Sequence, residues 1–268
     1  MKDFQNKIVV ITGGATGIGF SFAKQFGSRG AKLAIAGRRK NRLSEAVEKL
    51  IELGTEAVGF ECDVTKRQEV EALADFAWDT YGRVDVILNN AGVGPKISTV
   101  IETKREDIQK LYDVNIFGVW NGISVFGKRF LSQGIPAAIY NVGSENSFFD
   151  GVPHAAAYVS SKHAVLAITD ALRKEVPDFI DVGLICPGFV RSELAEDMSA
   201  GMDTDEYTAI AMKQIEAGEF FIVSHSYNMM RINERYQEIS KAYAKYAPRY
   251  EGDDEFDVRT LLDNLNQE

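Results

Sequence analysis

The sequence has few of the residues on which disulfide scaffolds, metal centres and membrane spans depend. Its 268 residues include two cysteines and three histidines. Cys62 and Cys186 lie in strand-like segments, so a reducing compartment is expected rather than a disulfide framework. The histidines share no ligand spacing with one another or with a carboxylate cluster, so no metal site is expected. No apolar run approaches the roughly eighteen residues that suggest a membrane-spanning helix.

Positive charge is also scarce. The chain has 30 Lys and Arg residues against 39 Asp and Glu residues, a formal net charge of −9. General binding to nucleic acid or to anionic membranes requires clustered positive charge, so neither partner is expected. The opening segment MKDFQNKIVVITGG has too short an apolar stretch for a secretory signal. We therefore expect a cytoplasmic protein.

The chain instead alternates strand-like and helix-like segments. Amphipathic segments separate short apolar runs, and this alternation predicts an α/β fold with a doubly wound parallel sheet and helices on both faces. The expected strands cover residues 7–12, 32–36, 56–61, 84–88, 135–142, 180–186 and 219–223, and the expected helices include residues 40–53, 66–80, 104–132, 155–176 and 228–246.

No repeat or clear linker interrupts this pattern. We expect one catalytic domain over residues 1–250, with a substrate-loop region at about 193–220 and a helical C-terminal extension. Residues 251–268 begin with EGDDEFD and are expected to form an acidic tail.

Unusual residues cluster where the expected strands end. In open parallel sheets, ligands bind outside the carboxyl ends of the strands, so these residues predict a binding site at one edge. They are Gly13 to Gly19, Arg38, Asp63, Asn89 to Gly92, Ser144, and Pro187 to Ser192.

The first of these clusters is glycine-rich. The segment TGGATGIG, residues 12–19, follows the first expected strand and opens a helix. Glycines let the backbone turn sharply beside a pyrophosphate, and a helix N-terminus offers free N–H groups. The GxxxGxG spacing differs from the common GxGxxG fingerprint, but the strand–turn–helix context predicts dinucleotide binding.

The end of the second strand indicates which dinucleotide is bound. Gly37-Arg38-Arg39-Lys40 lacks the carboxylate that would bind the adenosine ribose of NAD. Three cations at the start of a helix interact unfavourably with the helix dipole, so we expect them to have a role other than stabilising the helix. A guanidinium can pair with the 2′-phosphate of NADP. We expect NADP(H), with NAD(H) as the second choice.

Taken together, the motifs resemble the short-chain dehydrogenase/reductase family. The resemblance covers roughly residues 5–192, with the motifs in the family's order and spacing. The matching motifs are TGGATGIG (12–19), CDVT with Asp63, NNAG (89–92), VNIFG with Asn115, NVGS with Ser144, YVSSK (158–162) and PGFVRS (187–192).

The resemblance implies a Rossmann-type sheet of about seven strands and an oxidoreductase. The enzyme would interconvert a secondary alcohol and a ketone or aldehyde, as an alcohol dehydrogenase or carbonyl reductase. Tyr158 would be the general acid/base, and Lys162 would lower its pKa and hold the nicotinamide ribose. Ser144 would bond the reacting oxygen, and Asn115 would support a water relay to Lys162.

The resemblance also implies cofactor contacts. Asp63 and Val64 would flank the adenine, Asn90 would approach the ribose, and Val190 and Ser192 would meet the nicotinamide amide. The expected cofactor-binding set is Gly13, Thr16, Gly17, Ile18, Gly19, Arg38, Arg39, Asp63, Val64, Asn90, Ala91, Gly92, Tyr158, Lys162, Pro187, Gly188, Val190 and Ser192.

The spacing of Tyr158 and Lys162 suits this chemistry, because residues four apart share a helix face. A tyrosine acting near neutral pH needs its pKa lowered by about 3 units, or roughly 4 kcal/mol. One positive charge at about 5 Å supplies roughly 3 kcal/mol at an effective dielectric constant of about 20. Desolvation opposes the shift, so the charge of the oxidised nicotinamide would supply the remainder.

Some residues depart from the family pattern. Ser192 stands where threonine is common, and Thr16 stands where many NADP-using relatives carry a basic residue. The MKDFQ opening and the FFIVSH segment look similar to a bacterial subgroup with lignin-type aryl-ether Cα-dehydrogenases, which favour NAD. This likeness favours a bulky or aromatic secondary alcohol as the substrate.

Two alternatives stay open, an NAD-dependent aryl alcohol dehydrogenase and a dinucleotide-sensing regulator without turnover. Family likeness also implies a homodimer or homotetramer.

Overall fold

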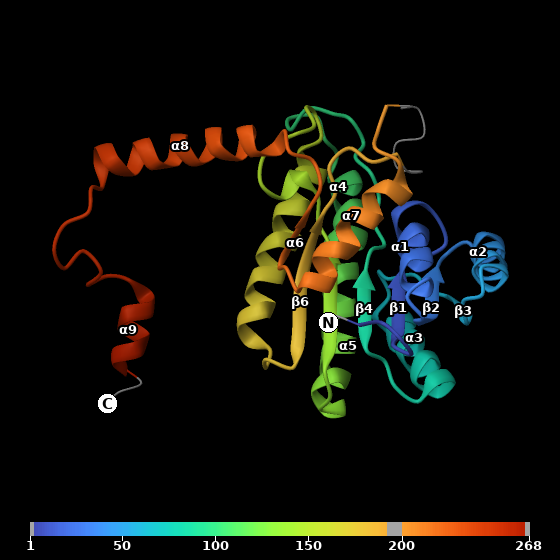
Figure 1. Cartoon of the computed structure of the whole chain (residues 1–268). Coiled ribbons are helices and arrows are strands. Elements are labelled where there is room, and N and C mark those ends of the chain that lie inside the picture. Colours follow the sequence, from blue (N-terminus) through green and yellow to red (C-terminus); the bar gives the residue numbers. More distant parts are fainter. Residues whose placement is uncertain (1–2, 192–199, 266–268) are drawn as a thin grey trace. The chain divides into compact units, whose positions relative to one another are not determined.

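The computed structural model describes residues 3–191 and 200–265. Its centre is a seven-stranded parallel sheet in the order β3-β2-β1-β4-β5-β6-β7 (Figure 1), which confirms the predicted fold class. The strands are β1 (Ile8–Thr12), β2 (Lys32–Gly37), β3 (Ala57–Glu61), β4 (Val86–Asn89), β5 (Ala137–Val142), β6 (Ile180–Cys186) and β7 (Phe221–Val223).

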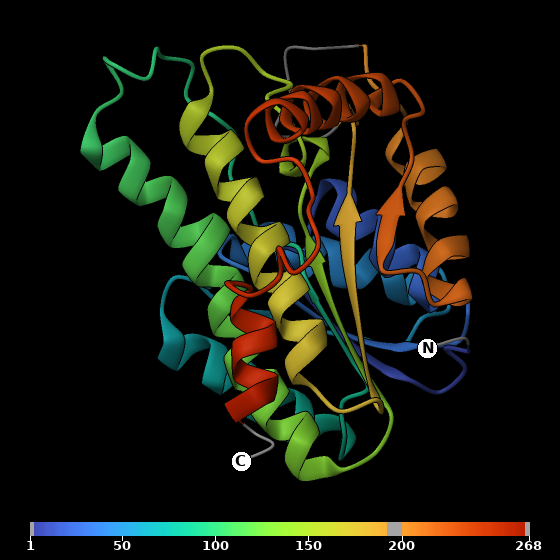
Figure 2. The ribbon, with the colours of Figure 1, turned by 90° about the vertical axis from the view of Figure 1, so that its left-hand side faces the viewer.

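Helices cover both faces of this sheet. They are α1 (Gly17–Gly27), α2 (Lys40–Glu52), α3 (Arg67–Tyr81), α4 (Arg105–Tyr112), α5 (Val119–Gln133), α6 (Ala156–Glu175) and α7 (Thr204–Ala217). Because side chains alternate along a strand, Val9 and Ile11 of β1 join one buried cluster while Ile8 and Val10 join another. The first cluster includes side chains of α1, α2 and α7, and the second includes those of α3 and α5. Figure 2 shows α5 and α6 on one side of the sheet and α7 on the other.

The strand order places the functional edge of the sheet. The order reverses between β1 and β4, which pair directly through Val9–Val86 and two further positions. Crevices that hold ligands form outside the carboxyl ends of strands at such a reversal. The glycine turn after β1 and the NNAG segment after β4 therefore adjoin there.

Contacts divide the chain into two compact units, residues 1–226 and residues 227–268. The second unit contains α8 (Asn228–Tyr246) and α9 (Val258–Leu265), and no residue of α8 is buried. The predicted helix at 228–246 is confirmed. A compact unit of contacts is not by itself a folding domain, so the catalytic domain over residues 1–250 and the acidic tail stay predictions. Across residues 3–191 and 200–265, no helix combines the length and the apolar character that crossing a bilayer requires.

Candidate active site

Tyr158 and Lys162 lie on consecutive turns of α6, as their spacing predicts. The Nζ of Lys162 lies 5.6 Å from the centroid of the Tyr158 ring. The same ammonium donates a hydrogen bond of 2.9 Å to the carbonyl of Val142, at the end of β5. Lys162 is 7% exposed, so water screens its charge little.

Burial dominates the titration of both groups. Desolvation lowers the pKa of Lys162 to about 8, and the nearby Cys186 has a smaller opposite effect. Desolvation raises the pKa of Tyr158, a hydrogen bond with Ser144 lowers it, and the charge of Glu145 raises it. The protein's own groups therefore leave Tyr158 a phenol near neutral pH. The lowering of this pKa by Lys162 and by the oxidised nicotinamide stays a prediction.

Ser144 caps the short 3-10 helix η2 (Glu145–Ser147), which follows β5. Its backbone N–H donates to the Ser147 hydroxyl at 3.2 Å, and that hydroxyl donates to the carbonyl of Lys162 at 2.9 Å. Its own hydroxyl oxygen accepts two hydrogen bonds of 3.2 Å, from the backbone N–H and the side-chain amide of Asn146. The turn is thus tied to α6, which carries the Tyr–Lys pair.

Asn115 lies in η1 (Asp113–Gly118), a π-helical turn between α4 and α5. Its amide oxygen accepts from the N–H of Val93 at 2.8 Å, and its amide nitrogen donates to the carbonyl of Val93 at 3.1 Å. The same nitrogen donates to the Ser161 hydroxyl at 3.3 Å, which donates to the carbonyl of Tyr158. Asn115 therefore links the segment after β4 to α6, and its water relay stays a prediction.

The glycine turn leaves no room for side chains on its inner side. Gly13 and Gly17 have φ values of +64° and +54°, where glycine is favoured. A Cβ on Gly19 would lie 2.3 Å from the carbonyl oxygen of Gly13. The turn leads directly into α1, and the first N–H groups of a helix are available to bind a pyrophosphate. These residues fit a dinucleotide.

Asn90 holds this turn from the end of β4. Its side-chain nitrogen donates to the carbonyls of Thr12 and Gly13 at 2.9 and 3.1 Å. The backbone N–H groups of Asn90 and Ala91 both donate to the hydroxyl of Thr12. Both amide hydrogens of Asn90 are therefore committed to the turn, and its approach to the ribose stays a prediction.

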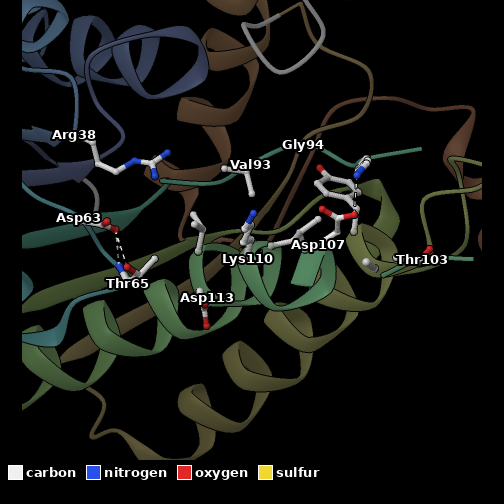
Figure 3. A pocket seen from close by; sticks show the side chains of 14 residues that line it. Arg38, Asp63, Thr65, Val93, Gly94, Thr103, Asp107, Lys110 and Asp113 are labelled. Atoms are coloured by element: carbon white, nitrogen blue, oxygen red, sulfur yellow. Dashed lines mark hydrogen bonds and ion pairs between the residues drawn. The ribbon is translucent and has the colours of Figure 1, made fainter. Parts of the chain in front are cut away.

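The two arginines after β2 lie near the same turn. The guanidinium of Arg39 donates to the hydroxyl of Thr16 at 3.2 Å. Arg38 projects into a cavity of about 430 Å³ (Figure 3) that also contains Asp63 and Tyr158. A Cβ on Gly37 would meet only Ala15, at 3.8 Å, so the space beside that position is open. A single cavity thus connects the expected phosphate-binding residue with the expected proton donor.

Other walls of this cavity come from the loop after β4 and from α4. Lys96 and Asp107 form an ion pair of 2.8 Å at its rim. Asp63 accepts hydrogen bonds from the backbone and hydroxyl of Thr65, which lines the cavity with it. The remaining lining residues are Val93, Gly94, Thr103, Lys110, Leu111, Asp113, Val114 and Ala157.

Several predicted cofactor residues act as spacers or supports in the described structure. Val64 is buried, and its carbonyl accepts from Asn121 at 2.9 Å. A Cβ on Gly92 would meet the amide oxygen of Asn115 at 3.4 Å. Ile18 is partly buried against the core cluster that contains Val9 and Ile11.

The PGFV segment after β6 borders the Ser144 turn. The carbonyl of Pro187 accepts from the backbone N–H of Glu145 at 2.8 Å. A Cβ on Gly188 would lie 2.4 Å from the ring of His225, and Val190 forms a bridge with Met202. Ser192 lies outside the described residues. Among the residues described, no three His, Cys, Asp or Glu side chains gather where they could hold a metal ion.

The sequence motifs did not single out Asn146 or Ser147, although both support Ser144. A signal was present, because a serine three residues before another hydrogen-bonding residue is the spacing of a capping box, which the structure contains here.

The chain is similar to known proteins over most of its length. A family model described as short chain dehydrogenase matches residues 7–203. The 1-deoxy-11-beta-hydroxypentalenate dehydrogenase of Streptomyces arenae is 29% identical over 249 residues, covering 88% of this chain and 88% of that protein. The C alpha-dehydrogenase of a Sphingobium strain is 32% identical over 197 residues, covering 73% of this chain and 64% of that protein.

A solved structure is also similar over nearly the whole chain. It is a short chain dehydrogenase/reductase from Burkholderia phymatum in complex with NAD. The TM-score is 0.85 at 27% identity, and the alignment covers 93% of this chain and 99% of that one.

Proposed function

Because the chain belongs to the short-chain dehydrogenase family, we propose that it is an NADP(H)-dependent oxidoreductase. The enzyme interconverts a secondary alcohol and a ketone or aldehyde. The observation that carries this proposal is the grouping of Lys162 and Ser144 about Tyr158, together with a cavity that both Tyr158 and Arg38 line.

Proton transfer is assigned to the Tyr158 hydroxyl. In reduction, the substrate's carbonyl oxygen accepts hydrogen bonds from Tyr158 and Ser144, and the phenol proton passes to that oxygen. Ser144 stabilises the negative charge on the reacting oxygen, and the buried Lys162 ammonium stabilises the phenolate that remains. The ammonium lies 5.6 Å from the centroid of the ring, and a unit charge at about that separation from a phenolate would contribute roughly 3 kcal/mol at an effective dielectric constant of about 20. When bound, the nicotinamide supplies or receives the hydride.

The remaining chain supplies binding and orientation. We assign the pyrophosphate to the glycine turn of residues 12–19, and the 2′-phosphate to Arg38 with Arg39 beside it. Two guanidinium groups and no carboxylate directly after β2 support NADP(H) over NAD(H). The similar Burkholderia structure holds NAD, so the preference must be measured on this chain.

We propose a bulky or aromatic alcohol or ketone as the substrate, because the MKDFQ and FFIVSH segments resemble those of lignin-type Cα-dehydrogenases. The likeness to a Sphingobium C alpha-dehydrogenase supports this proposal. We also propose a cytoplasmic homodimer or homotetramer.

The direct test is a cofactor-consumption assay on the full chain with a panel of aryl and alkyl ketones and alcohols. Turnover with NADPH well above that with NADH supports the proposal. The reverse preference favours an NAD-dependent aryl alcohol dehydrogenase. Saturable binding of either dinucleotide without turnover of any carbonyl or alcohol favours a sensing protein.

A further inference from the structure

We propose that Asn146 is a positioning residue that directs the hydroxyl hydrogen of Ser144 at the reacting oxygen. The inference rests on the proposed function, because it concerns the same proton-transfer site. It depends on a buried hydrogen-bond network in the turn after β5. In this network the donor and the acceptor of each hydrogen bond are fixed.

The orientation of the Asn146 amide is fixed by Gly151. The backbone N–H of Gly151 donates to the amide oxygen of Asn146 at 2.9 Å. A backbone N–H cannot accept a hydrogen bond, so the oxygen must face Gly151 and the NH₂ group must face the other way. That NH₂ group donates to the Ser144 hydroxyl oxygen at 3.2 Å. Asn146 is 3% exposed, so water does not compete for either contact.

The hydroxyl of Ser144 is then left with one role. A serine hydroxyl has one hydrogen to donate and two lone pairs that accept. Both lone pairs are used, by the backbone N–H and the side-chain NH₂ of Asn146. The hydroxyl hydrogen must therefore be donated away from Asn146. It points to the side of Tyr158, with which Ser144 forms a hydrogen bond, and the reacting oxygen of a substrate would accept it there in place of the phenol.

This arrangement suits both directions of the reaction. A phenolate and a carbonyl oxygen each need a hydrogen-bond donor. Ser144 could stabilise neither of them if its hydroxyl hydrogen pointed at Asn146 instead. Because Asn146 offers only donors, a hydroxyl hydrogen directed at it would meet other hydrogens. Asn146 thus sets the orientation of the Ser144 hydroxyl before the substrate arrives.

The test uses Asn146→Asp, which keeps the size and the acceptor for Gly151 but replaces the NH₂ donor with an acceptor. The Ser144 hydrogen can then turn to the carboxylate. We expect kcat to fall on the order of 100-fold, the range seen when one donor to a developing oxyanion is removed. The Kd for NADPH should stay within about twofold, because Asn146 lies apart from the glycine turn.

A double-mutant cycle with Ser144→Ala separates the effect of the charge that Asn146→Asp adds from the positioning effect. A charge effect persists when Ser144 is absent, whereas a positioning effect vanishes. We expect Asn146→Asp to lower kcat much less in the Ser144→Ala background than in the wild type. Equal factors in both backgrounds would overturn the proposal. Asn146→Ala, a neutral variant, repeats the cycle and stands in should the aspartate variant not fold.

An equilibrium readout separates this inference from the proposed function. The Tyr158 phenol can be titrated through its ultraviolet phenolate band, identified as the part that Tyr158→Phe removes, and no turnover is needed. We expect Asn146→Ala and Ser144→Ala each to raise the pKa of Tyr158, with no further rise in the double variant. An unchanged pKa in Asn146→Ala refutes the positioning role even if the wild type is an active reductase. Failure of the wild type to turn over any substrate refutes only the proposed function.

Discussion

The ammonium of Lys162 lies 5.6 Å from the ring centroid of Tyr158 and is anchored to the carbonyl of Val142. The anchor holds the charge beside the phenol on the carboxyl side of β5 instead of letting the lysine extend to solvent. Because burial lowers the pKa of Lys162 to about 8, its charge is sensitive to pH. Under the proposed mechanism, stability and catalysis are therefore coupled through this pair.

Tyr158→Phe should abolish turnover, with a loss of roughly 1000-fold or more, on the scale of about 10²–10⁴ that general acid–base catalysis contributes. NADPH affinity should remain nearly intact, because only the phenol oxygen is lost. Steady-state rates and fluorescence titration with NADPH measure the two effects. Tyr112→Phe is the matched control, since its phenol bonds Ser160 on the same helix as Tyr158. Equal activity of Tyr158→Phe and wild type would remove Tyr158 from the mechanism.

Arg38→Ala should weaken NADPH binding far more than NADH binding. Loss of a charge-assisted hydrogen bond costs about 1.5–3 kcal/mol, or roughly 10- to 150-fold in Kd. Calorimetric titration with both cofactors measures the difference. Arg42→Ala, exposed on the neighbouring α2 and paired with Glu45, controls for the loss of a surface charge. Matched losses for the two cofactors would refute the phosphate role of Arg38.

Lys162→Met should change the pH dependence of stability. The folded pKa of about 8 lies below the usual 10.5, so between these values the folded wild type binds fewer protons than the unfolded chain. Wild-type stability therefore gains a contribution as pH rises through this window, which the methionine variant lacks. The stability of Lys162→Met relative to wild type should fall by about 2–3 kcal/mol between pH 8 and pH 10.

Urea unfolding at several pH values measures this difference. Burial raises the pKa of Cys62 and Cys186 from 9.0 to about 12, so both thiols lower stability above pH 9. Their effect is present in both proteins and largely cancels in the comparison. A difference that stays constant from pH 8 to pH 10 would contradict the buried ammonium.

Gly19→Ala should weaken NADPH and NADH binding together. The new Cβ would lie 2.3 Å from the Gly13 carbonyl oxygen and 2.4 Å from the Asn90 amide nitrogen, so the turn must open. Gly127→Ala is the matched control, because that helical glycine has only Ile139 nearby, at 3.8 Å. The control should be neutral or more stable by up to about 1 kcal/mol. Unchanged affinity for both cofactors in Gly19→Ala would contradict the close fit.

Much of the fold was predictable because hydrophobic periodicity and strand ends are local features. The strand expected at 180–186 is β6, and the helix expected at 228–246 is α8. Alternation of the two element types was enough to predict a parallel sheet, and the sheet then brings Arg38 and Tyr158 to one cavity. The separation of Arg38 and Tyr158 in the sequence does not indicate that they line the same cavity.

The supporting contacts were not predictable in the same way. The helix expected at 104–132 contains the π-helical turn that carries Asn115, and a wider turn leaves no mark on apolar spacing. The NNAG motif singled out Asn90 but did not reveal that its amide holds the glycine turn. The orientation of the Asn146 amide depends on a hydrogen bond from Gly151, which exists only in the folded loop.

The sheet order has a consequence during biosynthesis. β6 is an inner strand, and the carbonyl of Pro187 that follows it anchors the segment with Ser144. A nascent chain still lacking β6 has the nucleotide turn but not a finished crevice around it. Nucleotide should therefore stabilise the completed chain and give little help to ribosome-bound intermediates that lack β6.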